Sequence, residues 1–382
     1  MAAALPSPDD VVNVLRGVVD PELGDNVVDL GMVKGVDVAA DGRVTVRIAL
    51  TIAGCPLRSQ IQKDVEARVR QLPGVETVGV EMGEMTQDER SALMARARWK
   101  AREKAPDTEI PATTRVIAVA SGKGGVGKSS VTVNLAVALA ARGLTVGVLD
   151  ADIWGFSVPR MLGVSGRLGG ADGKIHPNEK RVGDGLVKVV SMGHLVDDED
   201  QAIMWRGLVL TKALEQFLTD VRWGEMDYLL VDMPPGTGDI QMGLARLLPR
   251  TEMIIVTTPA MGAQKVAVRA ADMARRGYLG VAGVIENMTS FTCEHGAEYR
   301  LFGEGGGRRL AAQVGAPLVG QVPMEPGFAE EADAGRPAAL RDGPVADVFR
   351  SIAERVVTEL VPPVEMSGCT ARVFEQLEQA IS

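Results

Sequence analysis

A glycine-rich stretch with two lysines is the segment of this 382-residue chain best suited to chemistry. Residues 122–129 read GKGGVGKS and fit the pattern G-x-x-x-x-G-K-[ST]. Glycines at this spacing let main-chain N–H groups surround a phosphate, and the lysine that follows them can reach its terminal oxygens. An apolar, β-rich run precedes the stretch and a helical pattern follows it, as phosphate binding requires. A glycine-rich turn with a chance lysine, the alternative interpretation, does not explain that context.

Two side chains of this stretch and one downstream carboxylate predict a site for ATP and Mg²⁺. Lys128 is expected to reach the β- and γ-phosphates, and the Ser129 hydroxyl to bind Mg²⁺. The run Tyr228–Val231 predicts a buried strand that ends at Asp232, where a carboxylate can hold the same Mg²⁺. Behind it, the glycines of residues 233–239 would let a loop move with the γ-phosphate. Three such elements in this order indicate a P-loop nucleotide site.

The elements that would position these residues alternate between strands and helices. Apolar runs of strand length recur between residues 115 and 361, separated by segments with helical spacing. The expected strands are Val116–Ala120, Thr145–Leu149, Tyr228–Val231, Met253–Thr257, Val281–Ile285 and Pro317–Val322. Continuous apolar strands between helices are typical of a parallel sheet covered on both faces. Residues 113–361 are therefore predicted to form an α/β P-loop NTPase domain with a mostly parallel sheet.

Three other parts of the chain flank this domain. Residues 1–85 predict a small α/β domain, in which Arg43–Leu50 alternates as a half-buried strand and Val27–Leu30 is expected to be extended. Residues 86–112 are charged and are interpreted as a helical, solvated linker rather than as a surface for an acidic ligand. Residues 362–382 form a C-terminal tail.

Composition narrows the classes of function. The formal net charge of −9 argues against a nucleic-acid partner, whose binding surface on a protein is basic. No apolar run approaches the ~18 residues that a membrane span needs, so no membrane partner is expected. The three cysteines lack disulfide-like spacing, and the first residues lack the pattern of a signal peptide. A cytoplasmic protein is the expectation.

The second lysine of the glycine-rich stretch, Lys123, adds a resemblance to a known group. A lysine at this early position resembles the deviant Walker ATPases, the group that contains MinD, ParA and the nitrogenase iron protein. The resemblance implies a slow ATPase that works as a homodimer, in which Lys123 contacts the nucleotide of the partner subunit. A solvated loop lysine is the alternative. It also implies that Asp152, in the run Asp150–Asp152 after a strand, orients the attacking water.

The same relatives imply where the adenine base would bind. Asn287, expected at the end of a strand, is placed like an asparagine that bonds adenine in them, and its amide offers a donor and an acceptor. A turn-forming asparagine is the alternative. The loop Gln321–Met324, with Pro323, resembles one that covers the ring. The nucleotide-binding residues so predicted are Gly122, Lys123, Gly124, Gly125, Val126, Gly127, Lys128, Ser129, Ser130, Asn287 and Pro323.

Longer motifs resemble one branch of this group, the Mrp/ApbC-type iron–sulfur cluster carriers. The segments are GKGGVGKSS, DADIWGFSVP, MWRG, DYLLVDMPPGTGD and IENM, within residues 113–345. Residues 1–85 resemble the SufT/PaaD-type assembly factors through Asp20–Glu22 and Thr51–Leu57, which includes Cys55. The resemblance implies a carrier that binds clusters and transfers them to client apoproteins, with assembly factors as further partners.

One departure from that family concerns the cluster ligands. Members carry a C-x-x-C pair after the Asn-Met motif, and two subunits hold a bridging [4Fe–4S] cluster with it, whereas here Cys293 is alone in the segment Phe291–Gly296. His295, Cys369 or Cys55 are the candidates to complete the set, and Cys293 as a small buried hydrophobe is the alternative. An ATP-switched dimeric scaffold that holds no cluster is therefore a second hypothesis. A MinD-like membrane positioner is disfavoured by the acidic and neutral side chains of the tail.

Overall fold

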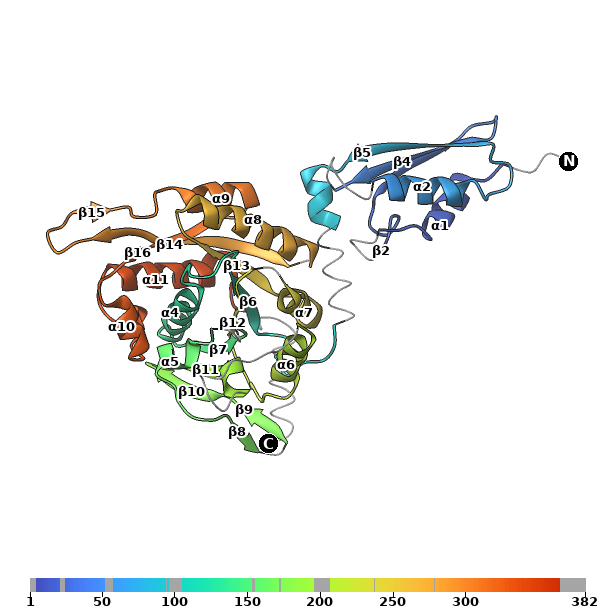
Figure 1. Cartoon of the computed structure of the whole chain (residues 1–382). Coiled ribbons are helices and arrows are strands. Elements are labelled where there is room, and N and C mark those ends of the chain that lie inside the picture. Colours follow the sequence, from blue (N-terminus) through green and yellow to red (C-terminus); the bar gives the residue numbers. More distant parts are fainter. Residues whose placement is uncertain are drawn as a thin grey trace. The chain divides into compact units, whose positions relative to one another are not determined.

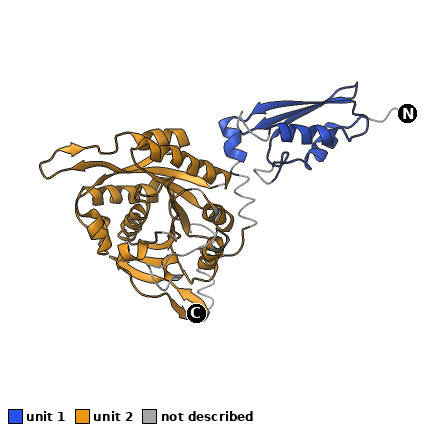
Figure 2. Cartoon of the chain, viewed as in Figure 1, with its two compact units in different colours: residues 1–104 blue, residues 105–382 orange. Residues whose placement is uncertain are grey.

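The computed structural model describes most of the chain as two compact units, residues 1–104 and 105–382 (Figure 2). The described residues are 5–20, 25–51, 58–93, 95, 105–152, 155–171, 173–195, 207–236, 238–277 and 279–364. The boundary between the units falls within the connector predicted at residues 86–112, where a helix covers residues 87–93. Cys55, Cys369, residues 96–104 and the tail from residue 365 lie outside the described residues.

The first unit is built on a three-stranded sheet, with two helices before the one at residues 87–93. Its elements are α1 (Pro8–Leu15), β1 (Val19–Asp20), β2 (Asp25–Asn26), β3 (Val33–Val38), β4 (Arg43–Leu50), α2 (Arg58–Val69) and β5 (Thr77–Glu84). The sheet order is β3-β4-β5; β3 and β4 are antiparallel, and β5 runs parallel to β4 because α2 connects them. Val44, Val46 and Ile48 are buried, which confirms the alternation predicted for β4.

The prediction of an extended segment at residues 27–30 of this unit is wrong. Residues 27–30 form a turn rather than an extended segment. The Asp29 N–H donates to Asn26 Oδ1 (2.9 Å), and Asn26 Nδ2 donates to Asp29 Oδ2 (2.9 Å). Short polar side chains that bond to nearby main chain in this way favour turns over strands.

The second unit is built on one large sheet. Its strands are β6 (Arg115–Ala120), β7 (Thr145–Asp150), β10 (Asn178–Val182), β11 (Gly185–Ser191), β12 (Tyr228–Asp232), β13 (Glu252–Thr257), β14 (Gly280–Thr292), β15 (Glu298–Tyr299) and β16 (Leu318–Met324). The order is β10-β11-β7-β12-β6-β13-β14-β16, with β15 paired to the far end of β14. All neighbours from β11 to β16 are parallel, and only the edge pairs β10–β11 and β14–β15 are antiparallel. The predicted mostly parallel sheet is confirmed.

Helices cover both faces of this sheet (Figure 1). On one face lie α4 (Lys128–Ala140), α5 (Val158–Leu162), α10 (Phe328–Asp333) and α11 (Pro344–Arg355). On the other lie α6 (Gly207–Thr219), α7 (Asp239–Leu247), α8 (Met261–Arg276) and α9 (Gly306–Val314). The remaining short elements are β8 (Gly169–Ala171), β9 (Lys174–His176), η1 (Met192–Leu195), η2 (Ala338–Leu340) and η3 (Val356–Leu360). None of the helices in the described ranges has the length and apolar character that a membrane crossing needs.

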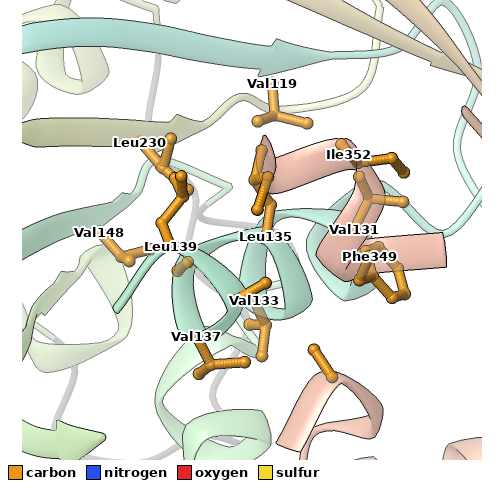
Figure 3. Packing of buried hydrophobic residues seen from close by; sticks show 14 of the residues in the cluster. Val119, Val131, Val133, Leu135, Val137, Leu139, Val148, Leu230, Phe349 and Ile352 are labelled. Carbon is orange, nitrogen blue, oxygen red and sulfur yellow. The ribbon is translucent and has the colours of Figure 1, made fainter. Parts of the chain in front are cut away.

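Helix α4, which begins at the glycine-rich stretch, is mostly apolar around its whole circumference because it is buried on all sides. Its residues from Val131 to Ala140 are buried. Figure 3 shows α4 packed between sheet residues such as Val148 and Leu230 and the α11 residues Phe349 and Ile352. This packing fixes the N-terminus of α4 against the sheet.

Parallel pairing brings the carboxyl ends of the central strands to one edge. Asp232, the last residue of β12, lies in register with Asp150 of β7 and with Val119 of β6. The glycine-rich stretch leaves β6 at this same edge. Loops at the carboxyl ends of parallel strands are where such sheets bind ligands.

Candidate functional site

The phosphate loop, residues 122–129, forms one wall of a cavity of about 600 Å³. Gly125 and Gly127 have φ angles of 78° and 79°, in the left-handed region that favours glycine. Gly127 is also the N-cap residue of α4, whose first N–H groups have no partner within the helix. Such a loop and helix end bind anions well.

A buried charge cluster lies behind the loop and is organised by Asp232. Lys128 Nζ lies 2.8 Å from Asp232 Oδ1 and 3.7 Å from Asp152 Oδ2, and Lys128 is only 6% exposed. The Ser129 hydroxyl donates to Asp232 Oδ2 (2.6 Å), and the Thr132 hydroxyl donates to Asp232 Oδ1 (2.9 Å). Hydroxyl and carboxylate oxygens are the donors that Mg²⁺ prefers, so Ser129 and Asp232 fit this ion. Thr132 was missed from the sequence, although its i+4 spacing from Lys128 puts it on the same helix face.

Asp150, which the sequence placed directly after a strand, is a second residue whose structural role the sequence did not reveal. It is fully buried and accepts hydrogen bonds from the Ser191 hydroxyl (3.0 Å) and from the N–H groups of Asp152 (3.2 Å), Ser157 (3.2 Å) and Val158 (3.3 Å). These bonds tie the segment after β7, which contains Asp152, to the end of β11. Burial, and then the negative charge of Asp232, raise the pKa of Asp150 to about 7.

The raised pKa of Asp150 predicts that the free energy of unfolding falls as the pH rises from about 4 to about 7. The unfolded chain loses this proton near pH 4, whereas the folded protein keeps it until about pH 7. The folded state therefore binds more protons in this window, and its stability decreases by up to about 1.4 kcal/mol per pH unit. Urea titrations across the window measure this slope. Asp150→Asn, which cannot titrate, should flatten the slope, and an unchanged slope would contradict the assignment.

Asn287 and the loop at residues 321–324, which were predicted to hold the base, contribute to the lining of the cavity. Val322, Pro323, Met324 and Phe328 line it, as does Asn287 itself. The Asn287 amide donates from Nδ2 to the carbonyl of Val126 (2.9 Å), which leaves Oδ1 as its acceptor. The prediction that Asn287 ends a strand is wrong, because β14 continues to Thr292, where antiparallel pairing with β15 extends it.

Lys123 and Cys293, two of the residues predicted to act between subunits, lie away from the buried charges. Lys123 is exposed, and no carboxylate of the described residues lies within ion-pair distance of it. Cys293 is half-buried in the turn after β14, where its N–H donates to the carbonyl of Ala297 (3.0 Å). Gly296, with φ of 80°, occupies the position where C-x-x-C spacing would place a second cysteine. The described residues contain no cluster of three or more metal-binding side chains.

Known proteins match both units. Residues 112–357 match a family model described as NUBPL iron-transfer P-loop NTPase, and residues 8–82 match one described as iron-sulfur cluster assembly protein. The iron-sulfur cluster carrier protein of Mycobacterium tuberculosis H37Rv is 44% identical over 353 residues, 90% of this chain and 91% of its own. The one from Deinococcus radiodurans is 40% identical over 357 residues, 92% and 95% of the two chains. A solved nucleotide-binding protein from Archaeoglobus fulgidus, in complex with ADP, is 33% identical, covers 65% of this chain and 94% of its own, and has a TM-score of 0.52.

Proposed function

Since the chain belongs to the family of NUBPL-type iron-transfer P-loop NTPases, we propose that it is an iron–sulfur cluster carrier that hydrolyses ATP and works as a homodimer. The cluster is its cargo, and the receivers are apoproteins and assembly factors. The observation that carries the nucleotide half of this proposal is the position of Asp232, which holds Lys128 on one carboxylate oxygen and Ser129 on the other.

The geometry supports a proposed role for each polar group in the reaction of ATP and water to ADP and phosphate. The phosphates of ATP would compete with Asp232 for the Lys128 ammonium, which is within 3.7 Å of both carboxylates that face it. Ser129 and Asp232 would hold Mg²⁺, which neutralises charge on the β- and γ-phosphate oxygens. Asp152, beside Lys128 and fixed by Asp150, would orient the attacking water. Lys123 is exposed, so it is available to the nucleotide of the partner subunit.

The part of the proposal that concerns cluster binding rests on fewer residues. A [4Fe–4S] cluster takes four thiolates, with histidine as an occasional substitute, and two copies of the described residues supply only two, the Cys293 pair. His295, 84% exposed at its side chain, lies on the same turn, and Cys55 and Cys369 lie outside the described residues. The glycine at position 296 favours the second candidate function, an ATP-switched dimeric scaffold that holds no cluster.

Anaerobic reconstitution distinguishes the carrier from the scaffold. Purified protein is incubated with ferrous iron and sulfide and desalted, and the retained iron and sulfide are counted per dimer alongside the visible absorption. We expect the wild type to retain both and Cys293→Ala to lose most of them, because a cluster depends on its thiolate ligands. The variant should still bind ADP, since Cys293 does not line the nucleotide cavity. A wild type that retains no iron would establish the scaffold instead.

A further inference from the structure

Strand β14 connects the nucleotide cavity to the turn that holds Cys293. At Asn287 the strand bonds to the phosphate loop through the carbonyl of Val126, and Cys293 directly follows its last residue, Thr292. Beyond the cavity, β14 and its partner β15 extend from the rest of unit 2 as a two-stranded arm (Figure 1). One continuous segment therefore touches both functional regions.

The pairing of β14 with β16 is interrupted between these two regions. Asn287 pairs with Val322 of β16, and the next pair joins Phe291 to Met324, so residues 288–290 lie opposite the single residue Pro323. Proline has no N–H to donate to a neighbouring strand, which suits it to such a bulge. Met288, the first residue of the bulge, has φ of 58° and is the only non-glycine residue with positive φ in the described part of the chain. A residue other than glycine keeps such a main-chain conformation only where the surrounding structure holds it there.

The phosphate loop is what holds Met288 and Asn287. A Cβ placed on Gly127 would lie 2.2 Å from Asn287 Nδ2 and 3.7 Å from Met288 Cε, so both side chains pack directly on this glycine. Met288 also lines the nucleotide cavity. On the side of the sheet, the preceding Glu286 is buried and fixed, because its carboxylate accepts from the Gly307 N–H (2.7 Å) and from Gln321 Nε2 (2.6 Å). The bulge is thus the first place after the fixed strand where the arm can change direction.

We propose that Asn287 and Met288 form a latch between the phosphate loop and the Cys293 arm, so that a nucleotide in the cavity changes the exposure of Cys293. This inference rests on the proposed function only in requiring that the cavity bind a nucleotide. The nucleotide contacts the latch directly, because both residues line the cavity. By linkage, a ligand on Cys293 changes the affinity for nucleotide by the same factor.

The alkylation rate of Cys293 tests the latch in the full-length protein. Iodoacetamide labelling is followed by peptide mass spectrometry, which reports Cys293 separately from Cys55 and Cys369, with and without saturating Mg-ADP. We expect the nucleotide to change the wild-type rate by about fivefold or more. Met288→Gly removes the side chain that contacts Gly127, and glycine adopts the same φ without strain. In this variant the addition of Mg-ADP should change the alkylation rate of Cys293 by less than about twofold.

A matched control separates the latch from a general loss of binding. Met324 lines the same cavity from β16, and Met324→Ala should weaken Mg-ADP binding yet keep the wild-type rate ratio once the site is saturated. Calorimetry on each protein sets the saturating concentration. Two outcomes would overturn the latch but not the proposed function. One is a wild type that binds Mg-ADP without a change in the alkylation rate of Cys293. The other is a Met288→Gly variant whose rate changes on Mg-ADP binding as much as that of the wild type. Absence of Mg-ADP binding in the wild type would overturn the proposed function together with the latch.

Discussion

Lys128→Ala is expected to lower ATP hydrolysis by at least about a hundredfold. Lys128 is the one ammonium group that the phosphate loop places in the buried charge cluster, within 2.8 Å of Asp232, the carboxylate proposed to hold Mg²⁺. Without it, the charge that develops on the transferred phosphate loses its nearest fixed cation. Release of inorganic phosphate from Mg-ATP, measured at saturating nucleotide, checks this result. A variant that folds and keeps the wild-type rate would show that hydrolysis occurs elsewhere.

The stability of this variant needs its own control, because Lys128 neutralises buried carboxylates. Removing it leaves Asp232 and Asp152 without the cation that now lies between them, at a cost of about 3 kcal/mol of folding free energy. Lys128→Arg keeps the charge but replaces a compact ammonium with a planar fork that does not match the site. We expect it to restore the thermal midpoint and not the hydrolysis. Recovery of both by arginine would mean that the charge alone, rather than its position, is required.

The site residues that the sequence grouped together, and that the structure also places in contact, are those whose relation is local or follows from strand order. Lys128 and Ser129 belong to one short motif, and Asp232 ends an apolar strand, so strand order alone brings them to the same edge. The fold class followed from the same alternation of strands and helices. Lys123 is predicted to contact the nucleotide of a second subunit, and Asp152 is predicted to orient the attacking water. Both roles stay predictions.

The residues that the sequence missed are joined by contacts between distant segments. Ser191, which donates to Asp150, lies 41 residues away on a strand that no apolar pattern had indicated as a neighbour of β7. The extension of β14 past Asn287 depends on pairing with β15 and on the bulge opposite Pro323, neither of which changes the local hydrophobic pattern. Register and bulges are properties of paired strands, so a single strand does not report them.

The first glycine of the phosphate loop is required for space rather than for conformation. Gly122 has an ordinary φ, unlike Gly125 and Gly127. A Cβ added to it would lie 2.2 Å from the carbonyl carbon of Val266 and 2.3 Å from the N of Ala267, both main-chain atoms of α8. The loop and this helix are therefore in main-chain contact, and no side-chain rotation can relieve the clash.

Gly122→Ala is accordingly expected to lower the free energy of unfolding by about 3 kcal/mol, because α8 or the loop must shift as a whole. The shift also displaces the N–H groups that face the phosphates, so the affinity for Mg-ADP should fall at least about tenfold. Chemical denaturation and calorimetry measure the two effects. Gly262→Ala, on the exposed start of the same helix with open space around it, is the matched control and should be neutral or stabilising by up to about 1 kcal/mol. Equal changes in the free energy of unfolding and in Mg-ADP affinity for the two variants would contradict the close approach of loop and helix.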